Sequence, residues 1–345
     1  IISAIVIVAY TTLGGFLAAS TTDFIQSIIM SVALIVVLIF GVETAGGIGA
    51  VIHNASELPG YLSMTLSYDV NTGKAAPYSA LTIVSTAAWG LGYFGMPHIL
   101  LRFMAIEDEK KLKLSRRVAT IWVVISLFVA VFIGVIGYTM SKVGALEMLT
   151  GSNSETIIVK ISALLSQHGV IFALLAGVIL AGILASTMST SDAQRLASSS
   201  AVSSDILGAF RKDSSNKNGS MAAARITLLV ISVVAAFIAR NPDSSVFAIV
   251  SFAWAGFGAA FGPVVLFSLF WKRTNKWGAL AGMVCGGSMV FIWKYLIRPL
   301  GGIWNIYELL PAFLIACAAI VIVSLLTPKP SKEIEEEFDR VAQMK

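Results

Sequence analysis

Long apolar stretches separated by short polar segments dominate the chain. Runs of about 20 predominantly apolar residues are typical of helices that cross a bilayer, whose hydrocarbon core is about 30 Å thick. The pattern predicts nine such spans, at about 1–19, 25–45, 79–101, 118–140, 166–198, 221–239, 245–270, 277–297 and 309–327. The sequence therefore predicts an all-α polytopic membrane protein.

One predicted span is interrupted by glycine and proline. Residues 89–98 hold three glycines, one proline and three aromatic side chains, among them Trp89, Tyr93 and Pro97. Gly and Pro disfavour a regular helix, and an opened backbone at bilayer depth is stable only where protein or a water-filled cavity pairs its amides and carbonyls. Because secondary transporters use such broken helices to hold substrate, we expect a substrate site here. The alternative is a proline-kinked helix that serves packing only.

A second candidate lies in the fifth predicted span, where hydroxyl side chains follow an apolar run. Ser186, Ser189 and Thr190 are spaced i, i+3 and i+4, which places them on one helix face. Hydroxyl and carbonyl oxygens can replace part of the hydration shell of a hard cation such as Na⁺, so these residues predict one wall of a sodium site. Ser and Thr in membrane helices also bond back to the carbonyl four residues earlier or join helices, and that packing alternative stays open.

Three charged residues near the predicted spans have structural interpretations. Asp192 and Arg195 are three residues apart on one helix, and we favour a local ion pair over a proton relay. Asp23 lies in the polar segment between the first two predicted spans, where we expect it to cap a helix. A functional acid is the alternative for Asp23.

Composition agrees with a membrane protein and argues against an enzyme. The chain is 57% hydrophobic and 12% charged, with a mean hydropathy of +0.86, whereas an average soluble domain carries about 25% charge. It holds no HExxH motif, no phosphate-binding loop and no Ser/His/Asp set, and its three histidines fall in different regions. We expect no enzyme activity, no organic cofactor and no nucleic-acid partner. Cys285 and Cys317 lie in apolar segments and are interpreted as packing residues.

Basic residues gather in every second connecting segment. The segments rich in Lys and Arg are 102–117, 211–217, 272–276 and 328–345. By the positive-inside rule these face the cytoplasm, which with nine spans places Ile1 outside and the C-terminus inside. The predicted organisation is a transmembrane core at 1–327 and a cytoplasmic tail at 328–345, whose mixed charges are typical of a solvated helix or a disordered end. Because the sequence opens at Ile1 inside an apolar run, we expect that preceding helices are missing from it.

Several motifs together resemble the sodium/solute symporter family, in its proline-transporting branch. The matching runs are GGFLA (14–18) with Thr22-Asp23, GLGYFG (90–95) with PHIL (97–100) and RFMA (102–105), MST (188–190), AWAGFGAAFGP (253–263) and GALAGM (278–283). The resemblance covers nearly the whole chain. It implies a LeuT-type core, an inverted repeat of five plus five helices with flanking helices, of which this chain would hold the last nine of thirteen spans.

The resemblance also implies roles for the candidate residues. Trp89, Tyr93 and Pro97 match family positions for proline binding on the sixth core helix. Ser189 and Thr190 match the sodium ligands on the eighth core helix, with a backbone carbonyl near Ser186 completing that side. The missing first core helix would supply the rest of both sites. This chain departs from the family pattern at Ser186, Asp192 and Arg195, and Asp192 leaves a different cation preference open.

The function implied is uptake of L-proline across the plasma (inner) membrane, coupled to Na⁺. One alternative is a symporter of the same family for another small solute, such as betaine, pantothenate or a carboxylate. Another is a transporter-like module that binds solute and signals. The tail ends without a phosphoacceptor or ATP-binding domain, which counts against the second alternative.

Overall fold

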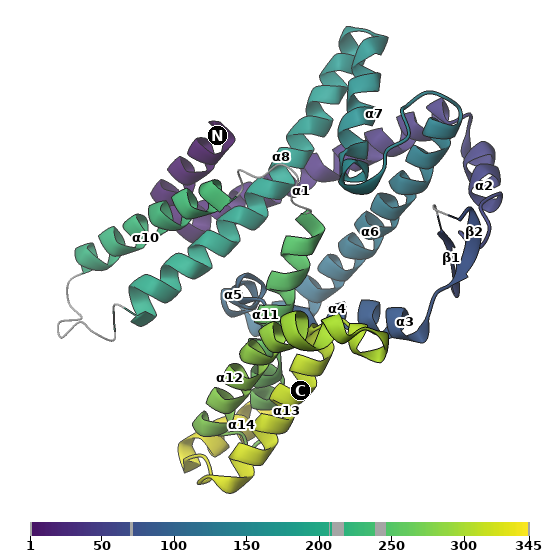
Figure 1. Ribbon diagram of the computed structural model, residues 1–345. Coiled ribbons are helices and arrows are strands. Elements are labelled where there is room, and N and C mark those ends of the chain that lie inside the picture. The colour runs from purple at the N-terminus through teal and green to yellow at the C-terminus, as the bar shows by residue number, and fades with distance from the viewer. Residues whose placement is uncertain (1, 70–71, 207, 209–216, 239–245, 344–345) are drawn as a thin grey trace. The chain divides into compact units, whose positions relative to one another are not determined.

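The computed structural model describes residues 2–69, 72–206, 208, 217–238 and 246–343 (Figure 1). The chain divides into two compact units. The first comprises Ile1–Ala76 and Ile106–Ser244, and the second comprises Pro77–Ala105 and Ser245–Lys345. Arg211 and Lys212 of the second basic segment lie outside the described residues.

The first unit is built from long helices with a small β-hairpin. Its helices are α1 (Ile2–Thr44), α2 (Ile48–Ser56), α6 (Leu112–Lys142), α7 (Ile157–Leu165), α8 (Val170–Ser200) and α10 (Lys217–Ile238). Its strands β1 (Leu66–Asp69) and β2 (Lys74–Pro77) pair in a two-stranded sheet. Short 3-10 turns lie at Glu109–Lys111, Gly151–Thr156 and Ser166–His168, and a π-helical turn follows α8 at Ala201–Ile206.

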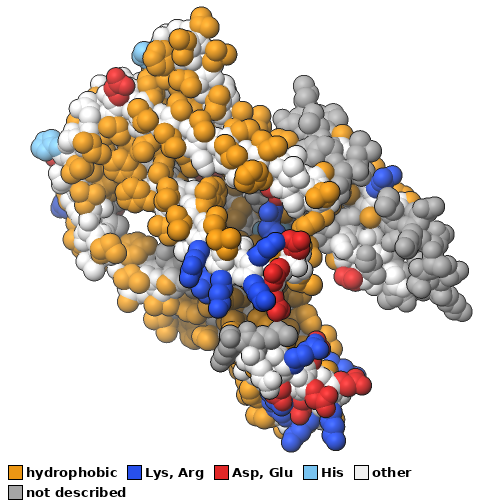
Figure 2. Space-filling model, turned by 180° about the vertical axis from the view of Figure 1, so that it is seen from behind, with side chains coloured by type: hydrophobic (Ala, Val, Ile, Leu, Met, Phe, Trp, Pro, Cys, Tyr) orange, Lys and Arg blue, Asp and Glu red, His pale blue; other side chains and the backbone are white. Residues whose placement is uncertain are grey.

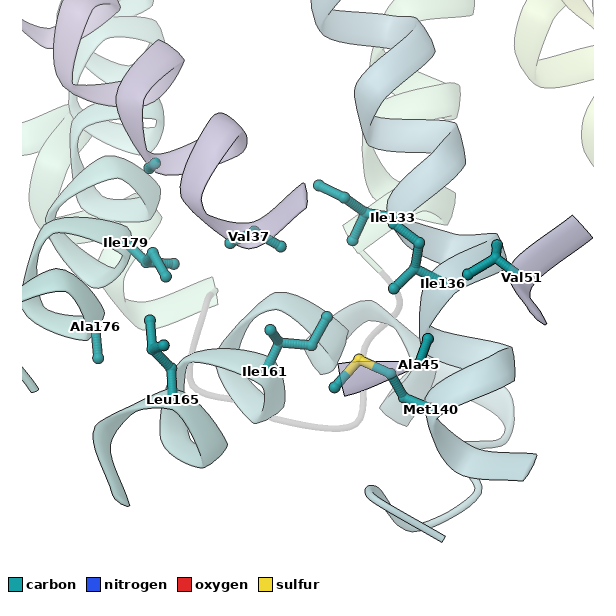
Figure 3. Close-up of a cluster of buried hydrophobic side chains, with 11 residues drawn as sticks. Val37, Ala45, Val51, Ile133, Ile136, Met140, Ile161, Leu165, Ala176 and Ile179 are labelled. Atoms are coloured by element: carbon teal, nitrogen blue, oxygen red, sulfur yellow. The ribbon is translucent and has the colours of Figure 1, made fainter. Parts of the chain in front are cut away.

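A buried apolar cluster joins α1, α6, α7 and α8 (Figure 3). Ile133 and Ile136 of α6 and Ile179 of α8 are fully or almost fully buried in it. Close approach between α1 and α8 depends on Gly182, since a Cβ there would lie 2.6 Å from the Cβ of Ala33. This core fixes one face of α8, the helix that carries the predicted sodium ligands.

Helix α1 runs without interruption through the loop predicted between the first two spans. It covers 43 residues, or about 64 Å at 1.5 Å per residue. Thr21 and Thr22 donate hydrogen bonds to the carbonyls of Leu17 and Ala18, so the polar segment is accommodated inside the helix. The prediction that Asp23 caps a helix is therefore wrong: Asp23 is buried in the middle of α1. The parity argument that placed Ile1 outside also loses its support, because it counted two spans here.

The second unit combines a broken helical segment with a packed helical bundle. The segment consists of α3 (Ala80–Ala87), α4 (Trp89–Gly92), a 3-10 turn (Tyr93–Gly95) and α5 (Pro97–Met104). The bundle consists of α11 (Val246–Phe270), α12 (Lys276–Ile292) and α13 (Leu309–Leu326). A π-helical turn at Trp293–Ile297 and two 3-10 turns, Arg298–Leu300 and Gly302–Asn305, connect α12 to α13, and α14 (Lys332–Gln343) follows.

The helices α12 and α13 pack through a glycine stripe on α12. A Cβ on Gly278 would lie 1.9 Å from Ser324 Oγ, and one on Gly282 would lie 2.4 Å from Ile320 Cγ1. Asn275 joins the two helices again at one end. Its Oδ1 accepts the N–H of Gly278 at 2.9 Å, while its Nδ2 donates to Thr327 Oγ1 at 2.7 Å.

Six helices of the described residues are long and apolar enough to cross a membrane, and the chain is a multi-pass membrane protein. They are Phe16–Thr44, Glu109–Lys142, Val170–Ser203, Val246–Phe270, Lys276–Leu300 and Leu309–Leu326. Many of their large apolar side chains are exposed, and Figure 2 shows hydrophobic side chains over much of the visible surface. A shorter apolar helix, Ala222–Ile238, matches the span predicted at 221–239.

The tail confirms one of its two predicted forms, since residues 332–343 are helical as α14. Its side chains are largely exposed. Lys272 Nζ donates to Asp339 Oδ2 at 2.5 Å, which ties the helix to the basic segment before α12. Asp339 of the tail thus has a basic partner within the same unit.

Candidate functional site

The predicted break in the span at 79–101 is confirmed. Helix α4 ends at Gly92, the next three residues form a 3-10 turn, and Met96 is extended, with φ −79° and ψ 112°. Pro97 is the first residue of α5, where the N–H that proline lacks would have no helical partner. The segment is therefore a change of backbone conformation and not a kinked continuous helix.

Two glycines bring this segment against the backbone of α11. A Cβ on Gly95 would lie 2.3 Å from the carbonyl oxygen of Phe257 and 2.9 Å from the amide nitrogen of Gly262. A Cβ on Gly92 would lie 1.9 Å from Trp254 Nε1. Any larger residue at either position would overlap α11, so these glycines serve close packing as well as the break.

Trp89 lies within a group of aromatic rings. Its ring stacks on Tyr307 at 5.7 Å between centroids, on Phe247 at 5.4 Å and on Trp254 at 6.0 Å. Tyr307 is buried and donates its phenolic hydrogen bond to the carbonyl oxygen of Ser251 at 2.6 Å. Burial raises the pKa of Tyr307 well above its usual range, and the charge of Glu308 adds to that shift. The phenol therefore stays a neutral donor, and Trp89 contacts three neighbouring rings.

Tyr93 is the most exposed of the three aromatic residues of the segment. The residue is 53% exposed and begins the 3-10 turn between α4 and α5. It meets Trp254 edge to face, with 4.7 Å between ring centroids and 85° between planes. Of the three predicted substrate residues, Tyr93 offers the most free surface, while Trp89 and Pro97 are half-buried.

Trp254 is the residue of this region that sequence reasoning missed. It entered only as part of a motif match, yet its Nε1 donates to the carbonyl oxygen of Trp89 at 2.9 Å. The signal that could have found it is a large aromatic residue among the small residues of Ala253 to Gly258. Such a residue needs space on the neighbouring element, and Gly92 provides that space.

The predicted sodium ligands lie on the regular helix α8. Ser189 Oγ and Thr190 Oγ1 both donate to the carbonyl oxygen of Ser186, at 3.3 Å and 3.2 Å. This is the bonding of the packing alternative. The same bonds also bring three oxygen atoms together, and a hydroxyl that donates its hydrogen keeps its lone pairs for a cation. The geometry is thus compatible with either interpretation.

Two charged residues, Asp192 and Arg195, lie next to this face on α8. Asp192 is fully buried on α8. Arg195 donates from Nη2 to Ser191 Oγ at 2.6 Å and from Nη1 to Ser232 Oγ at 3.4 Å, which links α8 to α10. The ion pair between Asp192 and Arg195 stays a prediction.

The two groups of predicted residues belong to different units of the structure. Trp89, Tyr93 and Pro97 lie in the second unit, and the residues of the hydroxyl face lie in the first. Within its own unit, each group shares one short stretch of chain.

Comparison with protein families gives one extensive match. Residues 1–286 match the model of a family described as the Sodium:solute symporter family. The match contains both candidate regions and most of the helices of both units.

Similar proteins include named transporters. The chain is 38% identical over 327 residues to an osmoregulated proline transporter of Bacillus subtilis, with 95% of this chain and 63% of that protein covered. It is 40% identical over 339 residues to a sodium/proline symporter of Haemophilus influenzae, with 96% of this chain and 64% of that protein covered. The chain thus spans slightly less than two thirds of the length of these relatives.

Solved structures with a similar fold include a transporter structure. It is the outward-open, substrate-bound state of a Na⁺-coupled sialic acid symporter, with a TM-score of 0.72 and 17% identity. The similarity covers 95% of this chain and 66% of that one. It supports the predicted fold class of a LeuT-type transporter.

Proposed function

Because the chain belongs to the sodium:solute symporter family, we propose that its protein is a secondary transporter that imports L-proline together with Na⁺. The choice of proline as substrate is supported by the identity of 35–40% to relatives named as proline transporters, over nearly all of this chain. Each Na⁺ that enters would contribute about 2.3 kcal/mol per 100 mV of membrane potential. The membrane is the plasma (inner) membrane, with the C-terminus in the cytoplasm.

The solute site comprises Trp89, Tyr93 and Pro97. The exposed face of Tyr93 supports this assignment, since an aromatic surface suits the compact pyrrolidine ring and the phenol can pair with the zwitterion. Trp89 contributes through its contact with Trp254, the ring that Tyr93 also meets. Pro97 starts α5 without an N–H, at the point where the helix resumes after the extended Met96.

The sodium site comprises the hydroxyls of Ser189 and Thr190 and the carbonyl oxygen of Ser186. Its support is that the three oxygen atoms lie together on one helix face, and a bound cation would replace one of the two hydroxyl hydrogen bonds at the Ser186 carbonyl. Sodium bound here would favour the outward-open form, proline would then bind, and movement of the helices would open the cytoplasmic side. Asp192, buried three residues after Ser189, is the charged group most able to alter cation preference.

The test is uptake of labelled proline by the full-length protein in proteoliposomes with an inward sodium gradient. Tyr93→Phe removes only the hydroxyl, and a hydrogen bond to a charged group is worth about 1.5–3 kcal/mol. We expect the half-saturating proline concentration to rise more in Tyr93→Phe than in the control Phe94→Leu. If the protein takes up betaine or pantothenate with sodium and takes up no proline, the assignment of proline is refuted and only the assignment to the symporter class stands.

Orientation has its own test. Single cysteines at Lys111 and Lys272 lie in basic segments of the two units. A membrane-impermeant thiol reagent is expected to label them in inside-out vesicles only. Labelling in right-side-out vesicles would reverse the proposed orientation.

A further inference from the structure

We propose that Trp254 of α11 is a positioning residue for the solute site, which holds the broken segment 89–97 in the shape that presents Tyr93. The inference rests on the proposed function, because it assigns a role to a residue behind the proposed site. Trp254 lies far from the segment in sequence, but both belong to the same unit of the structure. Three observations support it.

The first observation is a hydrogen bond from side chain to backbone. Trp254 Nε1 donates to the carbonyl oxygen of Trp89 at 2.9 Å. Trp89 is the first residue of α4, a helix of only four residues whose own hydrogen bonds cannot hold it. The bond therefore fixes the start of the broken segment to a helix of 25 residues.

The second observation is the fit of the indole to Gly92. A Cβ added to Gly92 would meet three atoms of the Trp254 ring, at 1.9 Å, 2.3 Å and 2.6 Å. The indole thus occupies the space that a side chain at position 92 would need. Neither residue can change size without displacing the other, which gives the contact one defined geometry.

The third observation is the contact with Tyr93 itself. The two rings meet edge to face at 4.7 Å, a favoured aromatic geometry. Tyr93 is 53% exposed, so without this contact its side chain would have rotational freedom to lose on binding. Holding a binding residue in place before the ligand arrives lowers the entropic cost of binding. Trp254 should therefore affect solute affinity more than the maximal transport rate.

The central experiment is a double-mutant cycle on sodium-driven proline uptake by the full-length protein. Trp254→Phe removes the N–H donor and keeps an aromatic ring. We expect the half-saturating proline concentration to rise about 2- to 13-fold, the range that one net hydrogen bond gives, with little change in maximal rate. In a Tyr93→Ala background, the same substitution should add little, because Trp254 acts through Tyr93. Additive effects of the two substitutions would overturn the proposal.

Trp271→Phe is the matched control. Trp271 follows the last residue of α11, and its ring meets Phe267. The control should leave both kinetic constants unchanged. A purely structural role of Trp254 would instead reduce the amount of folded protein and the maximal rate and leave the half-saturating proline concentration unchanged, and restoring abundance at low temperature would then restore the maximal rate.

A second measurement does not need transport. Hydrogen exchange of the amides in 89–97, followed by mass spectrometry on purified full-length protein, should be faster in Trp254→Phe than in wild type and unchanged in Trp271→Phe. Unchanged exchange in Trp254→Phe would refute the positioning role. If the wild type transports another solute and no proline, the proposed substrate fails, while the exchange result and the cycle run with that solute still decide the role of Trp254.

Discussion

The broken segment 89–97 and the hydroxyl face of α8 hold their candidate residues in opposite ways. The segment leaves helical geometry at Met96, and it packs against α11 through Gly92, Gly95 and Trp254. The hydroxyl face lies on a regular helix of 31 residues, and its bonds stay within one turn of that helix. Substitution of a contact residue should therefore destabilise the broken segment. Substitution of a hydroxyl residue on α8 should weaken ligand binding and leave the helix stable.

The largest expected effect comes from Gly95→Ala in the broken segment. The new Cβ would lie 2.3 Å from a carbonyl oxygen and 2.8 Å from a Cα of α11, and backbone atoms cannot easily move away. We expect the unfolding free energy to fall by about 1–3 kcal/mol or more. Thermal unfolding in detergent, with measured abundance in membranes, checks this.

The control for Gly95 lies five residues earlier. A Cβ on Gly90 would meet no atom within 4 Å, so Gly90→Ala should leave stability unchanged or raise it through helix propensity. Equal destabilisation by both alanines would mean that contacts with α11 do not set the shape of the segment.

On the hydroxyl face, the expected effect is on sodium and not on stability. Thr190→Ala and Ser189→Ala should each change the unfolding free energy by less than about 0.5 kcal/mol, because only an exposed bond within one helix is lost. The sodium concentration for half-maximal uptake should rise about tenfold or more, as expected for loss of an interaction with a charge. Uptake at varied sodium and fixed proline measures this.

Ser198→Ala is the matched control on the same helix. Ser198 Oγ donates to the carbonyl oxygen of Gln194, so it makes the same kind of bond about two turns beyond the proposed site. Its loss should leave sodium dependence unchanged. If all three alanines behave alike, the hydroxyls serve the helix only and the sodium assignment is lost.

A small effect on stability is also expected for Pro97→Ala. Proline at the first position of α5 removes an N–H that would lack a helical partner, so alanine should change the unfolding free energy by less than about 1 kcal/mol. An increase in the half-saturating proline concentration without loss of stability would sharpen the assignment of Pro97 to the solute site. A loss as large as that of Gly95→Ala would show that Pro97 itself, and not the packing on α11, maintains the break.

The sequence predicted a break within residues 89–98 because Gly and Pro act locally on the backbone. It did not predict the partner that stabilises the break, since Trp254 lies 165 residues away from Trp89 and no local pattern joins them. The hydroxyl spacing on α8 was also predictable, because helical periodicity fixes which residues share a face. The loop expected near Asp23 was wrong, since Thr21 and Thr22 satisfy their hydroxyls within α1 and a polar segment then needs no break.

The glycine stripe between α12 and α13 has a mechanical consequence. Side chains of α13 occupy the space that Cβ atoms of Gly278 and Gly282 would need. Asn275 joins the two helices at one end through its hydrogen bonds. Sliding one helix along the other by less than a full turn would force atoms to overlap. The two helices therefore transmit force as one lever, and a push on α12 displaces α13 by the same amount.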